Sequence, residues 1–144
     1  MKEPWQWEEE DIETLIREQR KEDLRLEYKR SDALGRTETA RTDISKDVSA
    51  MANSAGGAII YGIDEQRKSN GPIQLDKGVD PISVTPEWLE QVIDSGIQQR
   101  IDGIQIHPIQ WQMLENLFTS SGFPRATARR IWRRIIVTTN VSGP

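Results

Sequence analysis

The first half of the chain shows a helical pattern followed by a strand pattern. In residues 8–20 the apolar positions recur at helical spacing and acids fill the first turn, which predicts a short amphipathic helix. In residues 21–31 apolar and polar positions alternate, which predicts a strand with one buried face. Glu27 and Lys29 are therefore expected to share the face opposite the core.

A second helix and a buried strand are predicted further along. Residues 32–41 have no periodicity and are expected to form a loop, with Thr42 or Asp43 as the cap of the following helix. Gly56-Gly57 follows that helix, where a left-handed C-terminal cap belongs. Residues 58–63 are continuously apolar, which predicts a central strand covered on both faces.

The pattern of the second half is less regular. Turn residues surround a short apolar pattern at residues 73–75, which indicates a hairpin or an irregular excursion. A helix is predicted to start at Thr85-Pro86-Glu87, and a strand over residues 104–110, with Pro108 marking an edge strand or the strand's end. From Trp111 onward, two apolar stripes at helical spacing predict two further helices.

Composition excludes several classes of protein. A chain of 144 residues with 35% hydrophobic and 29% charged residues fits one folded domain, and no stretch approaches the roughly 20 apolar residues of a membrane span. The absence of cysteine excludes disulfide scaffolds, zinc ribbons and thiol nucleophiles. The acidic N-terminus argues against a secretory signal. We expect a cytoplasmic protein with no membrane partner.

The charge is distributed unevenly along the chain. The net charge of −4 divides into −5 over residues 1–28, −3 over residues 29–110 and +4 over residues 111–144. Proteins that bind nucleic acid over their whole surface are usually basic, because lysine and arginine neutralise phosphates and release counterions. Any nucleic-acid-binding surface here must be local.

Three carboxylates stand out by their placement: Glu22 before the first strand, Glu27 on it, and Asp64 at the exit of the central strand. If the two strands are neighbours, these acids can converge at one end of the sheet. Clustered carboxylates bind Mg²⁺ or Mn²⁺, and Lys29 could then hold a phosphate. The alternative is that these acids belong to an ordinary solvated face.

Two other features have simpler interpretations. His107 is the only histidine, and beside a proline on a strand it is interpreted as structural. The sequence RRIWRR near the C-terminus is the best local basic patch and could contact phosphates, although an amphipathic helix with a charged face is the commoner explanation.

Several motifs together resemble a known family. Glu22–Ser31 is similar to the opening pattern GES..LEFK of the Schlafen-type AlbA-like domain, a family assigned to DNA binding. Asp47–Gly57 and the following residues to Glu65 are similar to its AFANT.GG.L.IGVDD pattern, and Gly78-Val79 also fits. The motifs agree in order and spacing over residues 10–110.

The resemblance implies an α+β domain with a mixed β-sheet, packed helices and a link to nucleic acid. In Schlafen ribonucleases the catalytic carboxylates are a Glu, a second Glu five residues later, and an Asp after a GV dipeptide. The matching positions here are Glu22, Glu27 and Asp64.

The chain departs from the family pattern after about residue 110. The family usually continues with an apolar strand and a further motif. This chain instead has the two predicted helices and the arginine cluster after residue 110. We divide the chain into an AlbA-like domain, 1–110, and an atypical helical, Arg-rich tail, 111–144, from a truncated or frame-altered member. Loss of a strand would expose a sheet edge, which favours homo-oligomers.

Three functions remain open. The leading one is a nucleic-acid-binding domain of regulatory or defence type, for DNA or RNA, with the phosphates held by Lys29, Arg30, Arg36, Arg41 and Lys46. The second is a metal-dependent endoribonuclease in which Glu22, Glu27 and Asp64 hold Mg²⁺ or Mn²⁺. The third is a protein-interaction or oligomerisation module that ignores nucleic acid.

Overall fold

The fold is a mixed β-sheet between two layers of other elements. Residues 3–54, 56–66, 70–96, 103–118 and 124–139 are described in the computed structural model. The sheet has the order β1 (Leu26–Lys29), β2 (Gly57–Tyr61), β6 (Pro124–Thr139), β5 (Gln105–Phe118). β1 and β2 run parallel and the other pairs antiparallel. The expected α+β fold with a mixed sheet is confirmed.

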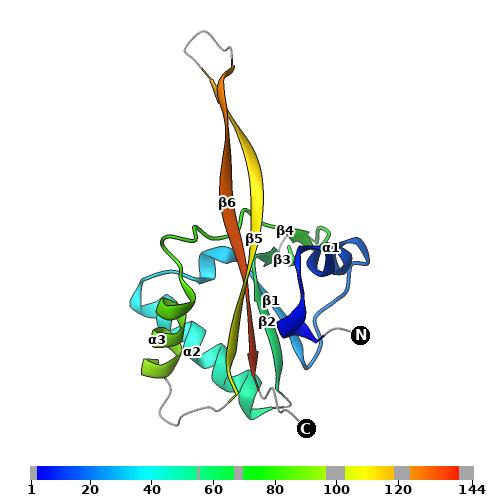
Figure 1. Ribbon diagram of the computed structural model, residues 1–144. Helices are drawn as coiled ribbons and strands as arrows, with labels where there is room; N and C mark the ends of the chain where they lie inside the picture. Colours follow the sequence, from blue (N-terminus) through cyan, green and yellow to red (C-terminus); the bar gives the residue numbers. More distant parts are fainter. Residues whose placement is uncertain (1–2, 55, 67–69, 97–102, 119–123, 140–144) are drawn as a thin grey trace.

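Helices cover both faces of this sheet (Figure 1). On one face lie α2 (Glu38–Asn53) and α3 (Pro86–Gly96), and on the other lie α1 (Glu9–Arg17) and the short hairpin of β3 (Ile63–Asp64) and β4 (Gln74–Leu75). Two 3-10 turns, η1 (Pro4–Gln6) and η2 (Ser31–Ala33), complete the described elements. No helix in the described ranges is long and apolar enough to cross a membrane.

Each face of the sheet has its own apolar core. Ile59 and Tyr61 of β2 pack with Ile44 and Val48 of α2 in one core, while Ala58 and Ile60 pack with the α1 side in the other. β2 lies between β1 and β6, and it is buried on both faces because α2 covers one face of the sheet and α1 the other. The prediction of a central covered strand is confirmed.

Two local predictions were wrong. α2 begins at Glu38, with the Thr37 hydroxyl accepting a hydrogen bond from the Ala40 amide at 3.1 Å, rather than after Thr42 or Asp43. Its first turn is largely exposed and therefore has no apolar periodicity. Leu24 was expected on the first strand, but the strand begins at Leu26 and Leu24 is 71% exposed.

The predicted helices of the tail are also wrong. Residues from Trp111 continue β5 and then form β6, and the outer part of this hairpin stands away from the body (Figure 1). Ile135, Ile136 and Val137 are fully buried in succession because β6 is an inner strand with a core on each side. β5 is an edge strand, as expected, and continues past Pro108.

Candidate nucleic-acid interface

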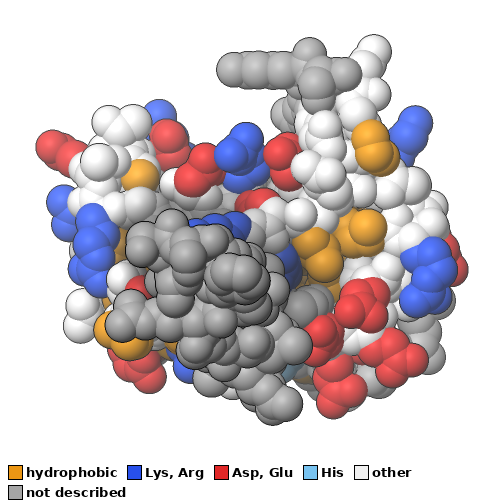
Figure 2. Space-filling model, turned by 90° about the horizontal axis from the view of Figure 1, so that it is seen from above, with side chains coloured by type: hydrophobic (Ala, Val, Ile, Leu, Met, Phe, Trp, Pro, Cys, Tyr) orange, Lys and Arg blue, Asp and Glu red, His pale blue; other side chains and the backbone are white. Residues whose placement is uncertain are grey.

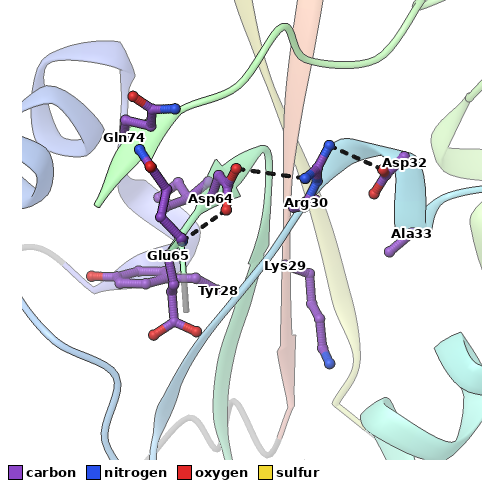
Figure 3. A pocket seen from close by; sticks show the side chains of 10 residues that line it. Tyr28, Lys29, Arg30, Asp32, Ala33, Asp64, Glu65 and Gln74 are labelled. Carbon is purple, nitrogen blue, oxygen red and sulfur yellow. Dashed lines mark hydrogen bonds and ion pairs between the residues drawn. The ribbon is translucent and has the colours of Figure 1, made fainter. Parts of the chain in front are cut away.

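The first strand directs neighbouring side chains to opposite faces of the sheet. Figure 3 shows Tyr28 and Lys29 leaving β1 in opposite directions. Leu26 and Tyr28 are buried in the core on the α1 side, while Glu27 and Lys29 are half-buried on the α2 side. Glu27 and Lys29 therefore share a face, as the alternation predicted.

Lys29 lies between two carboxylates. Its ammonium is 3.2 Å from Glu27 Oε1 and 3.6 Å from Asp47 Oδ2 on α2. Burial disfavours the ammonium, but the two acids together outweigh that effect, so the pKa of Lys29 is raised. Burial, together with Glu27, raises the pKa of Asp47 despite Lys29, because one lysine cannot neutralise two acids.

Tyr61 adds a buried hydroxyl on the same face. It is the β2 neighbour of Lys29 in the parallel register and is 1% exposed. Burial raises its pKa, and Asp47 and Glu27 raise it further. Glu27, Lys29, Asp47 and Tyr61 together form a polar cluster under α2, and the ammonium of Lys29 is directed into this cluster.

The next residue, Arg30, joins a different pair of acids. Its guanidinium lies 3.3 Å from Asp32 Oδ2 and 3.6 Å from Asp64 Oδ2, between the two carboxylates (Figure 3). Asp64 Oδ1 accepts a hydrogen bond from the Gln66 amide at 2.8 Å. Seen from above, acidic and basic side chains lie close together in the upper middle of the view, and several acidic side chains gather at the lower right (Figure 2).

These residues border a cleft of about 510 Å³. Its walls come from the end of β1, from η2 and from the β3–β4 hairpin. Asp76, directly after β4, fixes the hairpin to the start of η2 by accepting hydrogen bonds from the Ser31 amide at 2.6 Å and the Ser31 hydroxyl at 2.5 Å. The lining residues are Tyr28, Lys29, Arg30, Asp32, Ala33, Ile63, Asp64, Glu65, Gln66 and Gln74. We call this space the β1 cleft.

A second polar space lies between α2 and α3. This groove, of about 550 Å³, is lined by Glu38, Arg41, Thr42, Ser45, Lys46, Ser49, Val92, Ser95 and Gly96. Arg41 and Lys46 are exposed, and neither forms an ion pair or hydrogen bond with another part of the chain that the structure describes. We call it the α2–α3 groove.

The remaining predicted phosphate-binding residue, Arg36, is held by other contacts. Its guanidinium lies 5.2 Å from the centre of the Trp88 ring and donates a hydrogen bond to the carbonyl of Ser83. Trp88 also packs against the core, as expected for a structural tryptophan. His107 has a structural contact as well, with Nε2 2.7 Å from the carbonyl oxygen of Trp7.

A family model with the description "Schlafen, AlbA_2" matches residues 22–132. The chain belongs to the Schlafen AlbA_2 family. The match continues past residue 110 and includes all of the β1 cleft and the α2–α3 groove. No curated protein matches the chain. Membership of the AlbA_2 family points to a nucleic-acid-binding domain.

The AlbA_2 domain of this chain does not bring the three expected carboxylates together. Glu27 lies in the cluster under α2, and Asp64 pairs with Arg30. Glu22 lines a separate cleft of about 360 Å³ with Gln19, Lys21, Glu65, Gly71 and Ile73. Within the described ranges, no three acids or histidines lie close enough to hold a metal ion. The three-carboxylate Mg²⁺ or Mn²⁺ site stays a prediction that this arrangement does not fit.

Three polar residues of the AlbA_2 domain were not selected from the sequence. Asp47 lies beside the apolar stripe of α2, a position that signals contact with the sheet, but its partner Lys29 is revealed only by packing. Glu65 borders both the β1 cleft and the cleft containing Glu22. Asp76 has no periodic signal, because it lies in a turn-rich segment.

Proposed function

We propose that this AlbA_2 domain binds nucleic acid and that the α2–α3 groove contacts the phosphate backbone. The observation that carries the proposal is the difference among the five predicted phosphate-binding residues. Lys29 and Arg30 each face two carboxylates, and Arg36 is stacked on Trp88. Arg41 and Lys46 are exposed and free of such partners within the described residues.

The chemistry of the groove supports this assignment. Phosphate oxygens are bound in proteins by arginine, lysine and hydroxyl side chains. The groove combines Arg41 and Lys46 with the hydroxyls of Thr42 and Ser49, while Ser45 and Ser95 donate their hydroxyls to the carbonyl of Val92. A local site of this kind is compatible with a net charge of −4.

The test is the salt dependence of binding. Fluorescence anisotropy with a labelled single strand measures the affinity of the wild type and of the double variant Arg41→Gln/Lys46→Gln. Loss of two phosphate contacts makes the slope of log K against log salt shallower by about 1.4. The control, Arg17→Gln/Arg25→Gln, removes the same charge from exposed positions outside the groove and keeps the wild-type slope. Equal slopes for the two variants contradict the proposal.

A gel assay separates the other two functions. The protein is incubated with the labelled strand in Mn²⁺ or EDTA, and an endoribonuclease would show metal-dependent cleavage that is lost in Asp64→Asn. A stable multimer with no affinity for either RNA or DNA would instead indicate an interaction module.

A further inference from the structure

We infer that the β1 cleft accepts one unstacked nucleobase of a single strand and favours bases with an exocyclic amino group. The inference rests on the proposed function, because the base reaches the cleft only when the domain holds the strand.

The cleft has the size and walls of a small-ligand site. Its volume of about 510 Å³ falls within the range of roughly 300 to 1,000 Å³ that is usual for such sites. Tyr28 and Ile63 line the cleft with only 3% and 1% of their surface exposed, because both belong to the core on the α1 side, which keeps them fixed. The other side chains drawn around the cleft are mostly polar (Figure 3). A flat base with a hydrogen-bonding edge fits this arrangement.

The charges favour a base over a phosphate. Asp32, Asp64 and Glu65 line the cleft, and of the two cations there, Lys29 is directed to Glu27 and Asp47 under α2. Arg30 faces Asp32 and Asp64, so the acids that line the cleft outnumber the cations directed into it. A phosphate group would be repelled, whereas amino groups of a base would be attracted.

Two side chains are suited to read the edge of a base. Asp64 is held by the Gln66 amide through Oδ1, and Oδ2 is 3.6 Å from Arg30, too long for a hydrogen bond. Oδ2 can therefore accept a hydrogen bond from a ligand. Gln74 is exposed and contributes an amide with both donors and acceptors. A carboxylate pairs with the amino group of cytosine and finds no amino group on uracil.

The position of the cleft connects it to the α2–α3 groove. η2 forms one rim, and only Leu34 to Thr37 separate η2 from α2. A single strand bound along α2 through Arg41 and Lys46 can continue past η2 and place one of its bases at the cleft. A base in a duplex is stacked and paired, so the cleft selects single strands.

The experiment compares oligo(C), oligo(U) and a duplex, each of about 12 units, by anisotropy. We expect oligo(C) to bind about tenfold more tightly than oligo(U) and the duplex. Asp64→Asn and, independently, Gln74→Ala should bring the ratio of oligo(C) to oligo(U) affinity close to one. Asp94→Asn removes the same charge as Asp64→Asn from an exposed α3 position and should keep the ratio. Thermal melts verify that each variant is folded.

The outcomes separate this inference from the proposed function. Equal wild-type affinities for oligo(C), oligo(U) and duplex overturn the inference, and the proposed function survives if the α2–α3 groove variant still weakens binding. A tenfold preference that both cleft variants retain also overturns the inference. Absence of binding to all three probes overturns both.

Discussion

At the scale of single residues, Lys29 illustrates how position on a strand decides the role of a cation. Its sequence context, next to Arg30, offers two basic residues of equal interest. The pleat of β1 sends Lys29 under α2, between Glu27 and Asp47, and leaves Arg30 at the rim of the β1 cleft. We therefore interpret Lys29 as stabilising the fold and propose that Arg30 is the cation that a ligand would meet.

Replacement of this lysine should destabilise the protein. Lys29→Met leaves Glu27 and Asp47 facing each other without a cation, at a cost of about 1–2 kcal/mol in the free energy of unfolding at neutral pH. Urea denaturation measures the difference, and Lys21→Met, at an exposed position outside this cluster, is the control. A variant as stable as the control would contradict the role given to Lys29.

The same cluster predicts a dependence on pH. In the wild type the raised pKa of Lys29 means that its contribution is complete below the ordinary value of 10.5 and is lost as the pH rises through the folded-state value. Unfolding curves should therefore show an alkaline loss of stability that Lys29→Met lacks. As the pH falls through the raised pKa of Asp47, the difference between the two proteins should shrink, because a protonated Asp47 no longer repels Glu27. A pH-independent difference would contradict this account.

At the scale of elements, the glycine pair after α2 has two separate roles. Gly56 follows the end of α2 with a φ of 72°, in the left-handed region that the sequence predicted, and its amide donates a hydrogen bond to the carbonyl of Met51 at 3.0 Å. Gly57 has a φ of 143°, and a Cβ there would lie 2.2 Å from the carbonyl oxygen of Arg25. The second glycine therefore allows the start of β2 to approach the residue before β1.

This close approach gives a prediction about β1–β2 pairing. Gly57→Ala should lower the free energy of unfolding by more than 2 kcal/mol, because the clash is with backbone and the conformation is strained. Gly35→Ala, where the new methyl group would lie 3.3 Å from the Ala40 Cβ, should cost less. The midpoints of thermal unfolding of the two variants test this prediction, and an unchanged midpoint for Gly57→Ala would contradict the proposed close approach.

β6 carries polar residues in an inner position. Thr138 and Thr139 are each 2% exposed, and within the described residues neither hydroxyl has a hydrogen-bond partner. Such groups are costly in a core. The frame-altered origin of the tail stays a prediction. Such an origin would produce a strand whose residues are poorly matched to its buried position. Comparison of the other reading frames of the coding DNA tests it.

The mismatch also makes a prediction about stability. Thr138→Val should raise the free energy of unfolding by about 1 kcal/mol, because it removes an unsatisfied buried hydroxyl. Thr85→Val serves as the opposite control, since the Thr85 hydroxyl accepts a hydrogen bond from the Trp88 amide at the start of α3 and its loss costs about 1 kcal/mol. Denaturant unfolding that shows both variants destabilised would argue against a mismatch at β6.

The predictability of each element follows from what surrounds it. α1, β1, β2 and α3 carry patterns that match their burial, and their existence was predicted, with only the ends misplaced. The prediction of helices in the tail failed because Trp132, Ile135 and Ile136 fit a helical stripe, whereas they lie on a strand with a core on both sides. Strand pairing between distant segments leaves no local signal.

The same limit applies to the candidate site. The shared face of Glu27 and Lys29 was predictable from alternation, and so was the place of Asp64 after the central strand. Gly62, with a φ of 123°, separates β2 from β3 and places Asp64 on a second small sheet, so Asp64 meets Arg30 instead of Glu27. The partners of each charge depend on packing between distant elements, which the sequence alone does not reveal.

At the scale of the whole molecule, a protein with a net charge of −4 is expected to bind nucleic acid on a limited surface. The α2–α3 groove supplies cations without partners in the described part of the chain, and the β1 cleft supplies a polar site for a base. η2 lines the β1 cleft and precedes α2, which lines the groove. α1, with the acidic residues Glu9, Glu10 and Asp11 in its first turn, covers the face of the sheet opposite α2 and α3, and its acids should repel the nucleic acid.

The most direct test of this account is an NMR titration of the labelled domain with a single-stranded oligo(C), which reports each backbone amide. The account predicts shifts that concentrate at Arg41–Ser49 of α2 and around the β1 cleft, while the amides of α1 stay unchanged. Shifts that concentrate on α1, or none along α2 while the oligomer binds, would contradict it.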